Sequence, residues 1–208
     1  MIIVSHRGPY GFSESDNGAL APVRGPGGLA ATLHVLASSS DALVGSTCMS
    51  AAFSEGDKRA MSEPELPDVG TDVCFVALDQ DAHRLHYEVV SNEVLWFLFH
   101  GIFDLPRSPT FGRQFREAWD AYVSVNEAFA DAVISRAPEG EVVLVQDYPL
   151  ALVPGVLADK RPDLSISYFA HTPFCGPGGI RVLPDDVAAM LCRSLATRPA
   201  GFHTRRWA

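Results

Sequence analysis

The chain has 208 residues, 47% of them hydrophobic and 20% charged, with a formal net charge of −9 from 25 acidic and 16 basic residues. This composition is typical of a globular protein with a sizeable core, and the acidic balance argues against a nucleic-acid-binding surface, which needs a basic face. No apolar stretch approaches the roughly 20 residues of a membrane-spanning helix, so we expect neither nucleic acid nor membrane as a partner.

The cysteines and histidines give no sign of a disulfide framework or a metal site. The four cysteines are scattered, with no CxxC pair, and the apolar run at residues 2–4 is too short for a signal peptide. We therefore expect reduced thiols in a cytoplasmic protein. No group of His, Cys and Asp has the spacing of metal ligands, so no metal and no cofactor is expected.

The N-terminal residues predict a strand followed by a hairpin. Residues 1–5 are mostly apolar and include β-branched side chains, and a sharp turn follows at residues 5–9. Two extended arms then flank Asp16-Asn17-Gly18, which we interpret as a type I′ hairpin turn.

A glycine-rich segment at residues 24–28 precedes a helix predicted over residues 29–37. Glycines without Cβ let the backbone approach a ligand closely, at the point where free N–H groups of a helix point outward. Such a loop suits a phosphate group, and Arg7, at the end of the first strand, strengthens this interpretation.

The middle of the chain alternates short strands with polar turns. Residues 41–47 and 73–78 predict strands, residues 54–71 a surface loop or short helix, and residues 85–90 a further extended segment. The apolar segment 92–103 has the length of a helix and is interpreted mainly as core. Trp96 within it also has the flat face and the N–H donor that suit a sugar.

The clearest amphipathic helix is predicted over residues 114–137. Its apolar residues recur at three- and four-residue spacing and form one stripe, which we assign to the core. The members of the stripe are Phe115, Trp119, Tyr122, Val125, Phe129 and Val133.

A βαβ unit forms the chemical centre of the sequence. The buried strand predicted at residues 141–146 ends at Asp147, an apolar helix follows, and a second buried strand at residues 165–170 ends at His171. In an open parallel sheet the carboxyl ends of the strands line the crevice where ligands bind. We therefore expect the Asp147 carboxylate and the His171 imidazole at one edge of the sheet.

The remaining residues continue the alternation. A Gly/Pro loop follows His171, a helix is predicted over residues 183–195, and a strand over residues 201–204. Alternating strands and helices without a separable second run favour a single α/β domain with a parallel sheet and flanking helices.

Eight stretches, in order and at matching spacing, resemble the N-terminal half of trehalose-6-phosphate synthases. These enzymes are retaining glycosyltransferases built from two Rossmann-like domains, an arrangement called GT-B. The stretches are VSHRGP (4–9), GPGGLA (25–30), SNEVLWFLFH (91–100), WDAYVSVNEAFAD (119–131), VQDYPLALVP (145–154), YFAHTPF (168–174), RVLP (181–184) and GFHT (201–204).

The resemblance implies glucose transfer from UDP- or GDP-glucose to glucose 6-phosphate, with no metal required. It implies an acceptor site for the sugar phosphate formed by Arg7, Tyr87, Trp96 and Asp147. It further implies a nucleotide-sugar site formed by Gly27, Gly28 and His171, with Asp147 and His171 as the catalytic pair.

Some positions depart from the family pattern. The family usually has Asn at His6, His at both Gln146 and Pro149, and often Glu at Gly178. A tryptophan of the second strand is also missing. These departures bear on the identity of the substrate more than on the fold.

The resemblance covers only the acceptor-side domain, residues 1–208, which is apparently truncated; the C-terminal donor-binding domain of the family is absent from this sequence. Transition-state binding needs both walls of a cleft, so we expect little or no activity from this chain alone.

Three alternatives remain open. The acceptor could be a glycerol phosphate or a cyclitol phosphate. The chain could be a truncated, non-catalytic paralogue that binds sugar phosphate or a synthase subunit. A homo-oligomer or association with a full-length synthase is left open. The chain could also be a pseudogene product with exposed apolar surface, which would aggregate when expressed alone.

Overall fold

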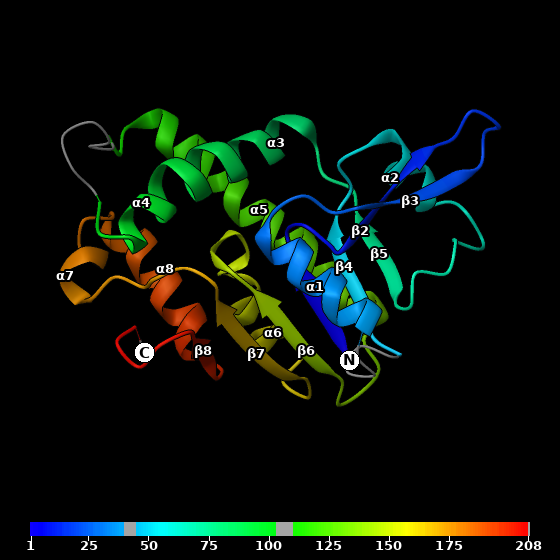
Figure 1. Ribbon diagram of the computed structural model, residues 1–208. Helices are drawn as coiled ribbons and strands as arrows, with labels where there is room; N and C mark the ends of the chain where they lie inside the picture. The colour runs from blue at the N-terminus through cyan, green and yellow to red at the C-terminus, as the bar shows by residue number, and fades with distance from the viewer. Residues whose placement is uncertain (40–44, 103–109, 208) are drawn as a thin grey trace. The chain divides into compact units, whose positions relative to one another are not determined.

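A computed structural model describes residues 1–39, 45–102 and 110–207 of the chain (Figure 1). The chain divides into two compact units, Met1–Ala77 and Leu78–Ala208, and each contains three parallel strands. Among the described residues, no helix has the length and apolar character needed to cross a membrane.

The sheet of the first unit has the strand order β5-β4-β1. The strands are β1 (Ile2–Ser5), β4 (Thr47–Ala51) and β5 (Asp72–Val76). Val4 of β1 pairs with Met49 of β4, and both side chains are fully buried. The predicted strands at residues 1–5 and 73–78 are confirmed.

The strand predicted at residues 41–47 is placed wrongly. β4 begins only at Thr47, after a turn in which Gly45 has a φ of 72°; residues 41–44 lie outside the described part of the chain. The apolar residues before the turn suggested a strand, whereas β4 itself has the sequence TCMSA, whose small and polar residues give a weak strand signal. Burial of β4 between two neighbouring strands overrides that weak local preference.

The predicted hairpin is present, with a different turn. Strands β2 (Tyr10–Glu14) and β3 (Leu20–Arg24) are antiparallel. Gly18 has a φ of 77°, but Asn17 has no positive φ, so the turn is not type I′. The Gly18 N–H instead donates to the Ser15 carbonyl at 2.8 Å, which gives a three-residue loop with glycine in the left-handed position.

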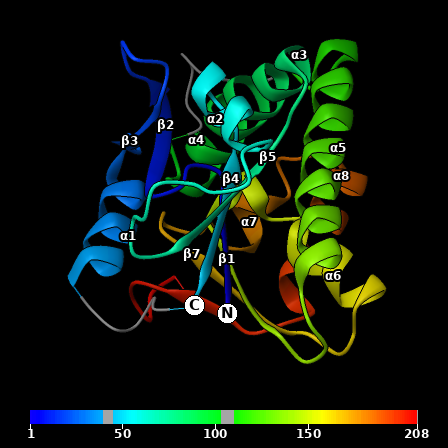
Figure 2. The ribbon, with the colours of Figure 1, turned by 90° about the vertical axis from the view of Figure 1, so that its right-hand side faces the viewer.

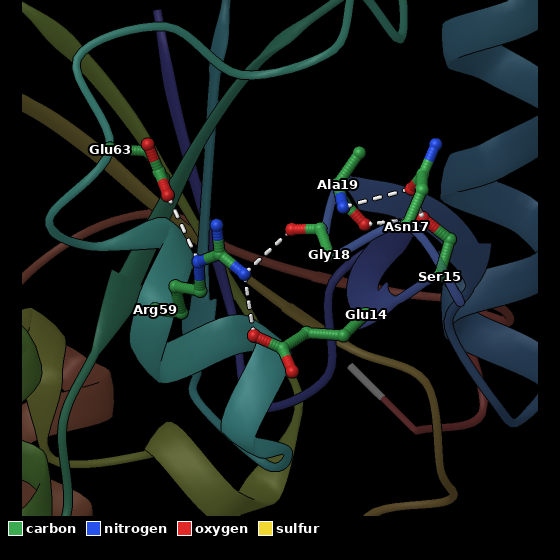
Figure 3. Close-up of polar contacts among 7 residues, drawn as sticks. All are labelled: Glu14, Ser15, Asn17, Gly18, Ala19, Arg59 and Glu63. Carbon is green, nitrogen blue, oxygen red and sulfur yellow. Dashed lines mark hydrogen bonds and ion pairs between the residues drawn. The ribbon is translucent and has the colours of Figure 1, made fainter.

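Polar contacts fix the tip of this hairpin (Figure 3). The Asn17 Oδ1 accepts hydrogen bonds from the Ala19 N–H at 3.0 Å and from the Ser15 hydroxyl at 2.6 Å. The guanidinium group of Arg59 donates to the Glu14 carboxylate and to the Gly18 carbonyl. These contacts hold the three-residue loop in its conformation.

The short helix α2 (Glu55–Ala60) also holds the middle of strand β2. The buried carboxylate of Asp57 accepts backbone N–H bonds from Phe12 at 2.7 Å and from Phe53 and Ser54 at 2.9 Å each. Because the carboxylate is satisfied by three donors, we assign Asp57 a structural role. The expected loop or short helix at residues 54–71 is confirmed.

The second unit contains the predicted βαβ arrangement. Its parallel strands, in the order β6-β7-β8, are β6 (Val142–Gln146), β7 (Ser165–Ala170) and β8 (Ala200–Phe202). Helix α6 (Val153–Lys160) connects β6 to β7, and α8 (Asp185–Ala196) precedes β8. The short helix α7 (Pro177–Ile180) lies in the loop after β7.

The long helix α5 (Arg113–Arg136) supplies much of the core of this unit. Every member of its predicted apolar stripe is at most 4% exposed. Figure 2 shows α5, α6 and α8 together on one side of β6 and β7. The interpretation of the stripe as core is confirmed.

The prediction of an extended segment at residues 85–90 is wrong. This stretch belongs to a π-helix, Leu85–Leu95, between α3 (Gln80–Arg84) and α4 (Trp96–Phe99). The side chain of Asp79 caps α3 by accepting the Ala82 N–H at 2.9 Å, so the helix starts before the β-branched pair Val89-Val90. The cap and the packing of the π-helix against α5 override the strand preference of that pair.

Candidate functional site

Asp147 lies directly after β6 and has an unusual backbone. Its φ is 68° and its ψ is 168°, a combination that is essentially limited to glycine. The Asp147 N–H donates to the Phe169 carbonyl at 2.8 Å, which continues the pairing of β6 with β7. The conformation turns the chain sharply from the strand into a 3-10 turn, Tyr148–Leu150.

The Asp147 carboxylate meets the residue that ends the neighbouring strand. Its Oδ1 accepts the backbone N–H of His171 at 3.0 Å. The structure therefore confirms that Asp147 and His171 lie at one edge of the sheet. Burial raises the pKa of the Asp147 carboxyl, while hydrogen bonding from backbone N–H groups and the nearby His100 and His203 oppose the increase.

The His171 ring is held by Gln146. The ring Nε2 lies 2.8 Å from the Gln146 Oε1. Because an amide oxygen only accepts hydrogen bonds, the neutral ring carries its proton on Nε2 and keeps a lone pair on Nδ1. Burial, together with the nearby His203, lowers the pKa of His171, which favours this neutral form.

His203 also belongs to this cluster, and sequence reasoning left it out. It follows β8, and its ring centroid lies 5.5 Å from that of His171 and 5.1 Å from that of Phe169. It ends the third parallel strand just as His171 ends the second, so the same rule would have identified it. Gln146, Phe169, His171 and Gly201 help to line a cavity of about 480 Å³.

Tyr87 and Trp96 lie on the π-helix and at the start of α4. The Tyr87 ring stacks on His83, with centroids 6.0 Å apart. The Trp96 ring packs on His100 at 4.1 Å, and the His100 Nδ1 lies 2.6 Å from the Trp96 carbonyl. Packing thus orients both predicted acceptor residues.

In the first unit, Arg7 follows β1 and lines a cavity of about 280 Å³ together with Gly8, Ser50 and Phe53. Its guanidinium carbon lies 5.0 Å from the centre of the Phe53 ring, a cation–π arrangement that limits the side chain's freedom. The Arg7 carbonyl accepts the Ser5 hydroxyl at 2.8 Å, which fixes the backbone at the end of the strand.

The glycine loop opens helix α1 (Gly28–Ser39), as predicted. Gly27 has a φ of 101°, and a Cβ added at Gly27 or Gly28 would meet open space. Gly25, which sequence reasoning did not single out, packs so closely that a Cβ there would lie 1.9 Å from the Gly8 carbonyl oxygen. The loop is therefore pressed against the turn after β1, while the next two glycines leave space for a ligand.

Within the described ranges, no cluster of three or more His, Cys, Asp or Glu side chains has an arrangement that could hold a metal ion.

Comparison with solved structures shows the fold. The chain matches a trehalose-6-phosphate synthase structure at 24% identity with a TM-score of 0.73, covering 99% of this chain and 41% of that one. It matches an α,α-trehalose 6-phosphate synthase from Burkholderia multivorans at 23% identity, also with a TM-score of 0.73. The Rossmann-like α/β fold, as in the N-terminal part of GT-B enzymes, is confirmed.

Comparison of sequences shows the family. A trehalose-6-phosphate synthase from Mycobacterium ulcerans is 37% identical over 174 residues, which are 83% of this chain and 33% of that protein. The Mycobacterium tuberculosis synthase is 36% identical over the same length. The chain thus spans about a third of the length of these relatives. The model of glycosyltransferase family 20 matches residues 1–208, and the chain belongs to that family.

Proposed function

We propose that this chain is the acceptor-side part of a retaining glycosyltransferase that transfers glucose from UDP- or GDP-glucose to glucose 6-phosphate. The observation that carries the proposal is the pairing of Asp147 with His171 at the ends of neighbouring parallel strands, in a chain of this family. A solved relative from Burkholderia xenovorans is described as a complex with glucose-6-phosphate, and one from E. coli as bound with UDP-2-fluoro glucose.

The acceptor roles follow from the chemistry of each side chain. Arg7 binds the phosphate through charge-assisted hydrogen bonds, and the Asp147 carboxylate accepts hydrogen bonds from sugar hydroxyls. Tyr87 and Trp96 provide aromatic surface for the sugar ring.

The donor roles rest on the glycine loop and His171. Gly27 and Gly28 give backbone N–H groups access to the diphosphate at the start of α1. His171, with its lone pair on Nδ1, accepts a hydrogen bond from a hydroxyl of the transferred glucose. A transition state with positive charge on the sugar is then stabilised by placed dipoles and by positioning of the acceptor.

Arg7→Ala tests the acceptor assignment. Isothermal titration of the chain with glucose 6-phosphate should show binding that the variant loses, by on the order of a hundredfold for a charged hydrogen-bonding partner. Lys58→Ala, an exposed lysine of α2, is the matched control for the loss of one positive charge. Equal affinity of wild type and Arg7→Ala would refute the assignment.

The identity of the acceptor needs its own test. Gln146 stands where the family usually has His, and its amide oxygen lies 2.8 Å from the His171 Nε2. A comparison of acceptors therefore tests whether this departure changes the preferred acceptor. Titration with glycerol phosphate and a cyclitol phosphate beside glucose 6-phosphate would identify the preferred class. Co-purification of this chain with a full-length synthase would favour a non-catalytic chain that associates with that enzyme.

Because both walls of a donor–acceptor cleft stabilise the transition state, we expect little turnover from residues 1–208 alone. The free thiols of Cys48, Cys74, Cys175 and Cys192 fit a cytoplasmic setting.

A further inference from the structure

The strained backbone of Asp147 needs a physical cause. It is the single non-glycine residue with a positive φ among those the structure describes. Residues in such sparsely populated regions persist only where the surroundings impose the conformation. The segment on each side of Asp147 shows how this happens.

On the upstream side, β6 is fixed by its ladder with β7. Gln146 pairs with Phe169, and the Asp147 N–H donates to the Phe169 carbonyl at 2.8 Å. The chain therefore arrives at Asp147 in a set position and direction.

On the downstream side, three buried side chains hold the carbonyls of the following turn. The Tyr122 hydroxyl donates to the Tyr148 carbonyl at 2.5 Å, and the Asn126 Nδ2 donates to the Pro149 carbonyl at 3.1 Å. The His86 Nε2 lies 2.8 Å from the same Pro149 carbonyl, so the ring carries its proton on that nitrogen.

The same three residues also fix one another. The Asn126 Oδ1 accepts the Leu152 N–H at 3.0 Å, and its Nδ2 also donates to the Tyr122 carbonyl at 2.9 Å. The His86 and Tyr122 rings stack with centroids 5.1 Å apart. All three side chains are fully buried, so water cannot replace these bonds.

We propose that Tyr122, Asn126 and His86 form a buried polar clamp that positions the Asp147 carboxylate for the acceptor. With β6 fixed before Asp147 and the clamp fixed after it, the aspartate takes up the conformation left between them, and its carboxylate is directed at the His171 N–H. Tyr122, Asn126 and His86 are positioning residues, because each acts on Asp147 through the Tyr148–Leu150 turn that it holds. The identity of the bound acceptor rests on the proposed function; the clamp itself does not.

Two clamp variants and one control test this proposal. Tyr122→Phe removes one hydroxyl and keeps the ring stack, and Asn126→Leu removes the amide at similar volume. Val133→Ala, in the same helix and also fully buried, is the control for a general loss of stability. Hydrogen exchange is measured at the His171 amide, which donates to Asp147, and at the Tyr168 amide, which donates to Pro199.

A positioning role predicts a local effect. In both clamp variants the His171 amide should exchange faster, on the order of tenfold relative to the Tyr168 amide, whereas Val133→Ala should leave that ratio unchanged. Glucose 6-phosphate should bind less tightly to the clamp variants than to the control. An unchanged exchange ratio in both clamp variants would overturn the clamp.

A matched pair at position 147 provides a readout without ligand. Asp147→Gly and Asp147→Ala both lose the carboxylate, but only glycine tolerates the backbone conformation. The Gly variant should melt higher than the Ala variant, and this difference should shrink when Asn126→Leu is added. An Ala variant as stable as the Gly variant would contradict the imposed strain. If the exchange and melting results hold while wild type binds no glucose 6-phosphate, the clamp stands and the proposed function fails.

Discussion

The glycine loop of the first unit and the Asp147 turn of the second unit solve a similar backbone problem in different ways. Each brings the chain from a strand into a helical segment through an unusual conformation. In the loop, glycines occupy the demanding positions, with Gly27 at a φ of 101° and Gly25 against the Gly8 carbonyl. In the turn, an aspartate takes the demanding position at a φ of 68° and three polar side chains enforce it.

In the proposed function the two segments contribute different groups to the ligand. The glycine loop would contribute backbone N–H groups, which need no side chains. The turn would contribute the Asp147 carboxylate, which glycine cannot supply, so its conformation must be stabilised by neighbouring residues. Predictions at the glycine loop, at His86 and at Gln146 test this contrast.

The largest effect is expected at Gly25, where the requirement for glycine is purely steric. A Cβ in Gly25→Ala would lie 1.9 Å from the Gly8 oxygen, so we expect a loss of about 3 kcal/mol of unfolding free energy. Gly27→Ala adds a Cβ in open space and should lose about 1–2 kcal/mol through its φ alone. Urea unfolding shows which of the two variants loses more unfolding free energy. Gly28→Ala is the control, because a Cβ at Gly28 meets open space and its φ is not positive. Equal losses at Gly25 and Gly27 would show that close packing is not the constraint.

The next effect concerns the pH dependence of the clamp. Burial lowers the pKa of His86 from 6.5 to about 4, so the folded state holds the ring neutral while the unfolded state takes up a proton as the pH falls. The stability that the neutral His86 ring contributes is fully present above pH 6.5. It is lost as the pH falls from 6.5 to about 4, by about 3 kcal/mol at most. Urea unfolding at pH 7 and pH 4.5 measures this loss.

His86→Gln separates protonation from hydrogen bonding. The amide N–H can still donate to the Pro149 carbonyl but does not titrate, so this variant should lose less stability on acidification than wild type. An identical acid response in the two proteins would assign the pH dependence to other groups.

The smallest effect is expected at Gln146, where an amide accepts the His171 Nε2 proton. Gln146→Glu replaces the accepting amide oxygen by a carboxylate, which should raise the pKa of His171 by about one unit at this half-buried position. Nuclear magnetic resonance titration of the ring measures it, with Gln114→Glu on α5 as the matched control. A His171 pKa that is the same in the Gln146 variant and the control would mean that Gln146 does not hold the ring.

Much of the fold and part of the site are readable from the sequence. Asp147 and His171 could be placed together because two buried strands end at them, and that rule depends only on the connection between parallel strands. The helix 113–136 has a clear period, and its stripe is core. Local patterns of this kind are set by burial of apolar side chains.

What could not be predicted depends on tertiary contacts. The π-helix replaces an expected extended segment because packing and an upstream cap decide the conformation of Val89 and Val90. The clamp could not be predicted because Tyr122 belongs to an apolar stripe. The carbonyl that accepts the hydrogen bond of its hydroxyl lies 26 residues further along the chain. No feature of the sequence indicates that Asp147 adopts a backbone conformation that is normally limited to glycine.

The conformation of Asp147 also predicts how this protein responds to directed evolution. Selection for heat resistance alone would favour relief of the strained backbone at position 147, which glycine provides. The same change would remove the carboxylate that faces His171. If Asp147 binds the acceptor as proposed, stability and ligand binding make opposite demands on position 147. A library screened for both properties should then retain aspartate there and accumulate its stabilising changes elsewhere.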